Sequence, residues 1–165
     1  EDILWLLGQI IDSFNTQENK SLGLPLGNVT SQLLINVYMN EFDQFIKNKL
    51  KVHCYIRHAD DFVIIYKNKE NLIELIPEIS LFLDKKLGLS LHPNKVFIKP
   101  KSSGLDFLGW VHFPHHRVLR TSTKRWMFKR LKQNHSKESL ASYLGLLSHG
   151  NTFKLTRRIL KRQNI

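Results

Sequence analysis

Apolar residues recur every three or four positions in three stretches of the first half of the chain. This spacing predicts amphipathic helices over residues 2–14, from about 30 to 46, and over 69–87. The apolar stripes of these helices are Ile3, Leu7, Ile10, Ile11 and Phe14; then Leu34, Tyr38, Phe42, Phe45 and Ile46; then Leu72, Ile76, Ile79, Leu83 and Leu87. We expect Gly88 to end the third helix, and Pro77 to kink that helix or to restart it.

Aromatic and β-branched residues dominate two runs, 53–58 and 61–66, which are predicted to form an antiparallel hairpin. A second hairpin is predicted where 105–113 pairs with 117–119 through a turn that begins at Pro114. The expected fold class is α+β, with a small antiparallel sheet packed on helices and an all-helical unit after it.

The last part of the chain carries the excess positive charge. Residues 1–119 contain 13 Lys or Arg and 13 Asp or Glu, whereas residues 120–165 contain 12 Lys or Arg and one acid, Glu138, so the net charge of +11 lies there. Apolar periodicity predicts helices from Thr121 or Thr123 to about Asn134, from Ser136 to just before Gly150, and over 152–162. A folded element this basic typically faces a polyanion, and a merely solvated face is the alternative.

Hydropathy and cysteine content limit the class of protein. Hydrophobic residues make up 42% of the chain, which is enough for a core. No run of ~18 apolar residues occurs, so a membrane span is excluded and no membrane partner is expected. The single cysteine, Cys54, lies in a strand predicted to be buried, and a reducing, cytoplasmic setting fits a chain without an internal disulfide.

Asp60 and Asp61 are adjacent at the junction of the first two strand-like runs. Neighbouring carboxylates repel each other, and a cation at the end of a strand would neutralise them. Oxygen ligands favour Mg²⁺. A solvated turn, in which Asp is common, explains the same residues without a metal. The pair alone leaves both interpretations open.

Four sequence blocks occur in a fixed order: Gly-Leu-Pro-Leu-Gly-Asn-Val-Thr-Ser-Gln (23–32), His-Ala-Asp-Asp (58–61), Leu-Gly-Leu-Ser-Leu-His-Pro-Asn-Lys (87–95) and Phe-Leu-Gly-Trp (107–110). In this order they resemble the palm of reverse transcriptases of the group II intron, retron and diversity-generating retroelement kind. The resemblance places a palm at residues 1–119 and a basic helical thumb at 120–165. Within the thumb, residues 142–145 and 150–153 look like the diversity-generating enzymes.

The resemblance implies a role for each matching residue. Asp60 and Asp61 match the pair that binds catalytic Mg²⁺, and Lys95 matches a lysine that assists the pyrophosphate leaving group. The residues that match the nucleotide and template pocket are Leu24, Pro25, Leu26, Gly27 and Gln32, and those that match the primer grip are Phe107, Leu108 and Gly109. The thumb residues expected to contact the nucleic-acid backbone are Lys124, Arg125, Lys129, Arg130, Arg157, Arg158, Lys161 and Arg162. The implied cofactors are two Mg²⁺ ions. The implied substrates and partners are an RNA template, a DNA primer, a dNTP and an accessory protein.

One carboxylate that the resemblance requires has no counterpart here. Nucleotidyl transfer with two metals needs carboxylates from more than one strand. In the family another metal-binding Asp lies on an upstream strand, but Asp2 and Asp12 both fall in the first predicted helix. We therefore expect that strand and the fingers upstream of Glu1, and we expect these 165 residues alone not to polymerise DNA.

Three positions depart from the common family pattern. His58 stands where the family has Tyr or another aromatic residue, Leu26 where many members have Gln, and Gln32 where many have Pro. The Leu26 and Gln32 version looks like diversity-generating enzymes, which copy template adenines unfaithfully. A missing hydrogen bond to the incoming nucleotide changes discrimination by roughly 1–2 kcal/mol.

Several other features have competing explanations. His112, His115 and His116 form either a zinc site or a solvated turn, and the turn is favoured because no Cys joins them. Trp110 is expected in the core, whereas Trp126 either stacks on bases or packs. Three classes of function remain: the palm and thumb of an RNA-templated DNA polymerase, a catalytically incomplete RNA- or DNA-binding module, and a structural α+β protein.

Overall fold

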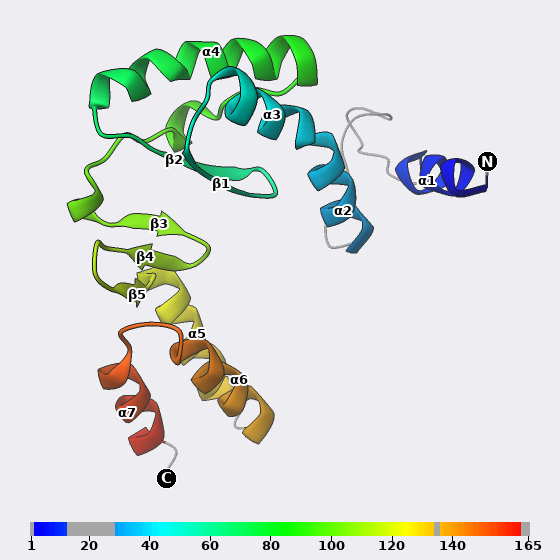
Figure 1. Ribbon diagram of the computed structural model, residues 1–165. Helices are drawn as coiled ribbons and strands as arrows, with labels where there is room; N and C mark the ends of the chain where they lie inside the picture. The colour runs from blue at the N-terminus through cyan, green and yellow to red at the C-terminus, as the bar shows by residue number, and fades with distance from the viewer. Residues whose placement is uncertain (1, 13–28, 134–135, 163–165) are drawn as a thin grey trace. The chain divides into compact units, whose positions relative to one another are not determined.

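The computed structural model describes residues 2–12, 29–133 and 136–162, without the side chains of Asp12, Val29 and Arg162. The chain divides into two compact units, residues 1–96 and 97–165, and each unit is described by itself (Figure 1). The division between palm and thumb at residues 119 and 120 stays a prediction. Among the described residues, no helix is long and apolar enough to span a membrane.

The first unit contains one antiparallel hairpin and several helices. Its elements are α1 (Asp2–Asp12), α2 (Val29–Tyr38), α3 (Asn40–Gln44), a π-helical turn (Phe45–Lys49), β1 (Cys54–His58), β2 (Asp61–Ile65), α4 (Lys69–Leu87) and a 3₁₀ turn (Pro93–Lys95). The helix predicted from 30 to 46 is interrupted at Met39, and its end widens into the π-helical turn. There the N–H of Leu50 donates to the carbonyl of Phe45 at 3.0 Å, five residues back.

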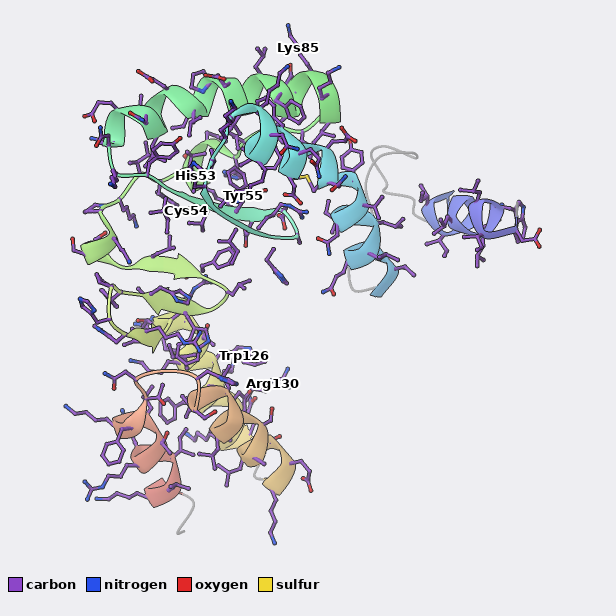
Figure 2. All side chains as sticks on the ribbon, in the orientation of Figure 1. His53, Cys54, Tyr55, Lys85, Trp126 and Arg130 are labelled. Atoms are coloured by element: carbon purple, nitrogen blue, oxygen red, sulfur yellow. The ribbon has the colours of Figure 1, made fainter. Side chains whose placement is uncertain are left out.

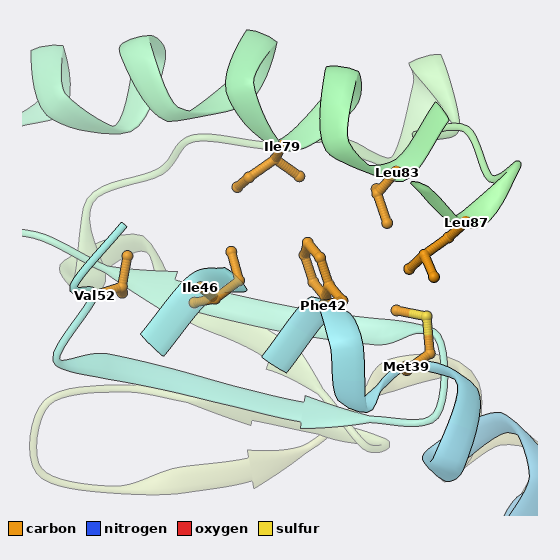
Figure 3. Close-up of a cluster of buried hydrophobic side chains, with 7 residues drawn as sticks. All are labelled: Met39, Phe42, Ile46, Val52, Ile79, Leu83 and Leu87. Carbon is orange, nitrogen blue, oxygen red and sulfur yellow. The ribbon is translucent and has the colours of Figure 1, made fainter. Parts of the chain in front are cut away.

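The core of the first unit lies between α4 and the α3 segment, where seven apolar side chains converge (Figure 3). They are Met39, Phe42, Ile46, Val52, Ile79, Leu83 and Leu87. Phe42 is fully buried and meets Phe62 of β2 edge to face, with ring centroids 5.0 Å apart. Burying each of these side chains contributes about 1.5–3 kcal/mol, so the core holds the hairpin against the helices.

Helix α4 has the bounds that its sequence predicts. It runs without interruption from Lys69 to Leu87, so it does not restart at Pro77, which lies inside it. Gly88 ends the helix with φ +57°, a left-handed conformation that glycine adopts without a steric penalty. Residues 89–92 and 96–99, on either side of the 3₁₀ turn, form no strand.

The second unit is a three-stranded antiparallel sheet joined to three helices. Its elements are a 3₁₀ turn (Lys101–Ser103), β3 (Leu105–Phe107), β4 (Trp110–His112), β5 (Arg117–Leu119), α5 (Thr121–Gln133), α6 (Lys137–Leu147) and α7 (Phe153–Arg162). Ser136 caps α6 as expected, because its side chain accepts from the N–H of Ser139 at 3.2 Å.

The expectation of a single strand over 105–113 is wrong. A two-residue turn at Leu108 and Gly109 divides this run into β3 and β4, which pair with each other. Both residues have positive φ, +51° and +80°, which is the backbone of a type I′ hairpin turn. Gly109 makes this turn possible, although the flanking residues have the composition of one strand.

The loop between α6 and α7 packs directly on the sheet of the second unit. Its Asn151 N–H donates to the carbonyl of Arg117 at 2.8 Å. A Cβ at Gly150 would lie 2.1 Å from a ring carbon of Trp110, whose side chain is buried, and 3.0 Å from the Arg117 carbonyl. The close approach of this loop therefore requires glycine at position 150.

We expect Gly150→Ala to lower the free energy of unfolding by about 1–3 kcal/mol, because the new methyl group must displace Trp110 or the backbone. Gly145→Ala in α6 is the matched control, since its Cβ would meet nothing within 4 Å. Alanine is the better helix former, so the control should be neutral or slightly stabilising. Thermal unfolding of the two variants measures the difference, and equal melting temperatures would contradict the close packing.

Candidate functional site

The two adjacent aspartates lie at the tip of the first hairpin, as the sequence predicts. His58 pairs with Asp61 in the last register position, which leaves Ala59 and Asp60 as the two loop residues. Ala59 has φ +53°, a conformation that is uncommon for residues other than glycine. With a Cβ present, a positive φ at this loop position costs roughly 1–3 kcal/mol. Asp60 and Asp61 lie at this strained turn, and both are exposed.

The two faces of the hairpin have different environments. Tyr55, Phe62 and Ile64 pack against the core of the first unit. The opposite face carries Cys54 and Ile56, which are both exposed. The prediction that Cys54 is buried is wrong, because a two-stranded sheet packed on one side buries only alternate residues.

The core-facing side of the hairpin carries an arginine whose side chain is only 8% exposed. Arg57 donates from Nε to Asp43 Oδ1 at 2.8 Å and from Nη2 to Asp43 Oδ2 at 2.6 Å, a bidentate ion pair. Its Nη1 donates to the carbonyl of Ala59 at 2.8 Å and to Oδ1 of Asn36 at 3.1 Å. Arg57 thus connects the turn that carries Asp60 with α2 and α3.

Asp43 is held by a second donor, the hydroxyl of Tyr55, at 2.6 Å. The hydrogen bond from Arg57 lowers the pKa of Asp43 from its usual 3.8, and the bond from Tyr55 acts in the same direction against partial burial. The bond to Asp43 raises the pKa of Arg57, and burial raises the pKa of Tyr55. Asp43 is therefore ionised at neutral pH and compensates the charge of Arg57.

Sequence reasoning missed this ion pair. The available signal was the position of Arg57, which alternates with Tyr55 on the core-facing side of a predicted strand. A charged side chain on that side needs a buried partner, because an unpaired buried charge is costly. The sequence does not reveal which acid is the partner, since Asp43 lies 14 residues away.

We expect the stabilising effect of Asp43 to disappear in acid. Because the folded-state pKa of Asp43 lies below 3.8, its contribution is present above that pH and is lost as the pH falls through the lower folded value. At pH 7, Asp43→Asn should lower the free energy of unfolding by about 1–2 kcal/mol. Denaturant unfolding between pH 7 and pH 3 measures this difference, which should shrink in the acid range. A difference independent of pH would contradict the ion pair.

The Asp60–Asp61 turn fits a divalent cation that prefers oxygen ligands. The ion pairs of the described residues are Arg57 with Asp43 and Arg120 with Asp106, so neither turn aspartate has a protein cation as partner. In the same ranges, no cluster of three or more His, Cys, Asp or Glu side chains could hold a metal. Mg²⁺ is commonly bound by one or two carboxylates together with waters and substrate phosphates. Asp60 and Asp61 would be the carboxylate ligands that this chain supplies.

The remaining residues of the predicted pocket are only partly within the described structure. Gln32 is exposed on α2, and Lys95 is exposed at the end of the 3₁₀ turn, where its N–H donates to the His92 carbonyl at 2.9 Å. No ion pair in the described ranges joins Lys95 to Asp60 or Asp61. Leu24, Pro25, Leu26 and Gly27 lie outside the described residues.

In the second unit, the predicted primer-grip residues form the turn between β3 and β4. Phe107 is buried, Leu108 is 52% exposed, and the Gly109 carbonyl accepts from the N–H of Arg120 at 2.9 Å. The Arg120 side chain donates from Nε to Oδ1 of Asp106 at 2.6 Å. These contacts fix the turn to the start of α5 and leave the Leu108 side chain at its exposed tip.

The basic residues of the second unit are mostly exposed and have no acidic partner among the described side chains except for Arg120. On α5, Lys129 and Arg130 are exposed, whereas Lys124 is half-buried; on α7, Arg157, Arg158 and Lys161 are exposed. Arg125 of α5 is also exposed, and the side chain of Arg162 is not among those that the structure describes. The exposed cations are accessible to external anions.

Two of these arginines lie over aromatic rings. Arg130 covers the exposed Trp126 at 4.4 Å from the ring centroid (Figure 2), and Arg158 lies 5.2 Å from the Phe128 ring. Such contacts fix the guanidinium groups and contribute about 0.5–1 kcal/mol at exposed sites. Trp110, in contrast, is a core residue, as expected, and His116 stacks on Phe113 in the turn after β4.

Comparisons with known proteins agree with this arrangement. The family model described as "Reverse transcriptase (RNA-dependent DNA polymerase)" matches residues 3–112, two thirds of the chain, including the Asp60–Asp61 turn and the β3–β4 hairpin. The chain is 29% identical to "Protein YkfC" of Escherichia coli, with 63% of this chain and 34% of that protein covered. It is 22% identical to the "Putative COX1/OXI3 intron 2 protein" of Saccharomyces cerevisiae, with 61% and 18% covered. The matched region thus spans about a third or less of these relatives, and over that region the chain belongs to the reverse transcriptase family.

Proposed function

We propose that this chain is the palm and thumb part of an RNA-templated DNA polymerase. The observation that carries the proposal is the Asp60–Asp61 pair, at a strained hairpin tip with no protein cation paired to it among the described residues, within the region matched by the family model. Adjacent carboxylates without a protein cation as partner favour a divalent cation, and this family uses divalent cations for nucleotidyl transfer.

Mg²⁺ bound there would lower the pKa of the primer 3′-hydroxyl and neutralise the triphosphate. Asp60 and Asp61 would hold it, with a further carboxylate from a strand upstream of Glu1. Gln32 would line the nucleotide pocket, together with Leu24, Pro25, Leu26 and Gly27. Lys95 would assist departure of pyrophosphate, and Phe107, Leu108 and Gly109 would contact the primer end. The exposed lysines and arginines of α5 and α7 would bind phosphates of the RNA and DNA backbone.

The pattern at Leu26 and Gln32 favours the error-prone, diversity-generating type of enzyme, which would act with an accessory protein.

Primer extension tests the polymerase proposal directly. A protein that joins this chain to its upstream segment should extend a DNA primer on an RNA template when Mg²⁺ and dNTPs are present. Failure to extend, together with tight nucleic-acid binding, would favour the alternative of a catalytically incomplete binding module.

A further inference from the structure

Arg57 occupies a position that the proposed chemistry does not by itself explain. It does not pair with the nearby Asp60 or Asp61, although it is a cation on the same hairpin. Instead, its guanidinium group forms four hydrogen bonds to three other elements: the Asp43 carboxylate of α3, the Asn36 amide of α2 and the Ala59 carbonyl in the turn. A planar group with five donors in fixed directions is suited to such a junction.

The bond to Ala59 acts directly on the proposed metal-binding turn. The accepting carbonyl belongs to the peptide group between Ala59 and Asp60, 2.8 Å from Nη1 of Arg57. Ala59 has φ +53°, so the turn is held in a costly conformation that surrounding contacts must maintain. Arg57 provides one such contact and thereby fixes the direction in which the Asp60 side chain leaves the backbone.

The bond to Asn36 connects the same arginine to the helix that carries Gln32. Asn36 lies four residues after Gln32 on α2, so the two side chains share one face of the helix. Arg57 Nη1 donates to Asn36 Oδ1 at 3.1 Å. The guanidinium group therefore links α2, which carries the proposed nucleotide-lining residue Gln32, to the turn that carries the proposed metal ligands.

Asp43 keeps Arg57 in this place. Its two oxygens accept from Arg57, and one of them also accepts from Tyr55 at 2.6 Å. Asp43 follows Phe42, which is fully buried in the core, so the anchor is rigid. Compensation by Asp43 also reduces the attraction of Arg57 to the turn carboxylates, which leaves Asp60 and Asp61 available to a metal ion.

We propose that Arg57 is a positioning residue that sets the geometry between the nucleotide-lining helix α2 and the metal-binding turn. Asp43 is its anchor and Asn36 its link to α2. The inference rests on the proposed function, because it assigns Arg57 to the arrangement of that same site.

Single-nucleotide primer extension by the protein with its upstream segment tests the inference, with dNTP and Mg²⁺ varied separately. Arg57→Lys retains the charge but cannot reach all three partners, so KM for dNTP and the half-saturating Mg²⁺ concentration should each rise roughly tenfold. Asn36→Ala removes only the link to α2. It should raise KM several-fold and leave the Mg²⁺ dependence unchanged.

Gln44→Ala is the matched control, since Gln44 is the neighbour of Asp43 and its side chain bonds Asn40 and Asn48 on its own helical segment. Its KM for dNTP and its half-saturating Mg²⁺ concentration should equal those of the wild type. An independent readout is the ¹⁵N spectrum of the 165-residue chain. The amide resonances of Asp60 and Asp61 should shift in Arg57→Lys and stay in place in Gln44→Ala.

The outcomes separate the inference from the proposed function. Unchanged extension by Asp60→Asn in the same assay would overturn the polymerase proposal itself. An inactive Asp60→Asn variant, together with Arg57→Lys and Asn36→Ala variants that match the control in KM and Mg²⁺ dependence, would overturn only the role of Arg57. A loss of thermal stability in Arg57→Lys without either kinetic change would also overturn it, because that result shows a purely structural ion pair.

Discussion

Replacing either aspartate of the turn by asparagine is expected to reduce primer extension by at least about 10³-fold in the protein that includes the upstream segment. Asn keeps the size of the side chain but loses the negative charge that holds Mg²⁺. A bound metal contributes several kcal/mol to the transition state, and each 1.36 kcal/mol corresponds to about tenfold in rate. Steady-state extension by Asp60→Asn and Asp61→Asn at saturating dNTP measures the effect.

The fold should tolerate both changes. Neither Asp60 nor Asp61 is buried or forms an ion pair with another described side chain, so the melting temperature should stay within about 2 °C of the wild type. Asp106→Asn is the comparison for thermal stability. It also replaces an aspartate by asparagine, but it weakens an ion pair with Arg120 in the second unit and leaves the Asp60–Asp61 turn intact. Extension that survives in Asp60→Asn and Asp61→Asn would remove the polymerase interpretation.

The second large effect is expected on nucleic-acid affinity. We predict that replacing Arg125, Lys129, Arg157 and Lys161 by Ala weakens binding of an RNA–DNA duplex by roughly a hundredfold or more at about 0.1 M salt. The loss should be similar for unrelated sequences, because phosphate contacts carry no sequence information. The slope of log K against log salt should become shallower by about 0.7–0.9 for each phosphate that the variant no longer neutralises. Fluorescence anisotropy over a salt series measures both quantities.

A control with the same change in net charge comes from the first unit. Lys67, Lys69, Lys85 and Lys86 are exposed at and near α4, and their replacement by Ala also removes four positive charges. This variant should retain the salt slope of the wild type. An equal loss of affinity in both variants would show that net charge, rather than the basic helices, determines binding. Affinity that does not depend on salt would contradict the thumb assignment.

Local patterns predict much of this fold because the relevant signals are close together in the sequence. Apolar periodicity and Gly88 define both ends of α4, and Ser136 defines the start of α6. The Asp60–Asp61 hairpin follows from two strand-like runs with only a short loop between them. These elements needed no knowledge of tertiary contacts.

The features that sequence reasoning missed depend on contacts between distant residues or on a single backbone conformation. The pairing of Arg57 with Asp43 joins a strand to a helix, and no local pattern selects that acid among the others. The run 105–113 has the composition of one strand, and only the positive φ values of Leu108 and Gly109 divide it. The exposure of Cys54 follows from the number of layers around the hairpin, which composition does not specify.

The central claim is that the Asp60–Asp61 turn holds the divalent ion. Paramagnetic broadening by Mn²⁺ tests it most directly, in the ¹⁵N-labelled protein with its upstream segment and a bound primer–template. We predict that sub-stoichiometric Mn²⁺ broadens the amide resonances of residues 58–62 first, that excess Mg²⁺ reverses the broadening, and that an Asp60→Asn, Asp61→Asn double variant abolishes it. Broadening that begins elsewhere, or that persists in the double variant, would contradict the account.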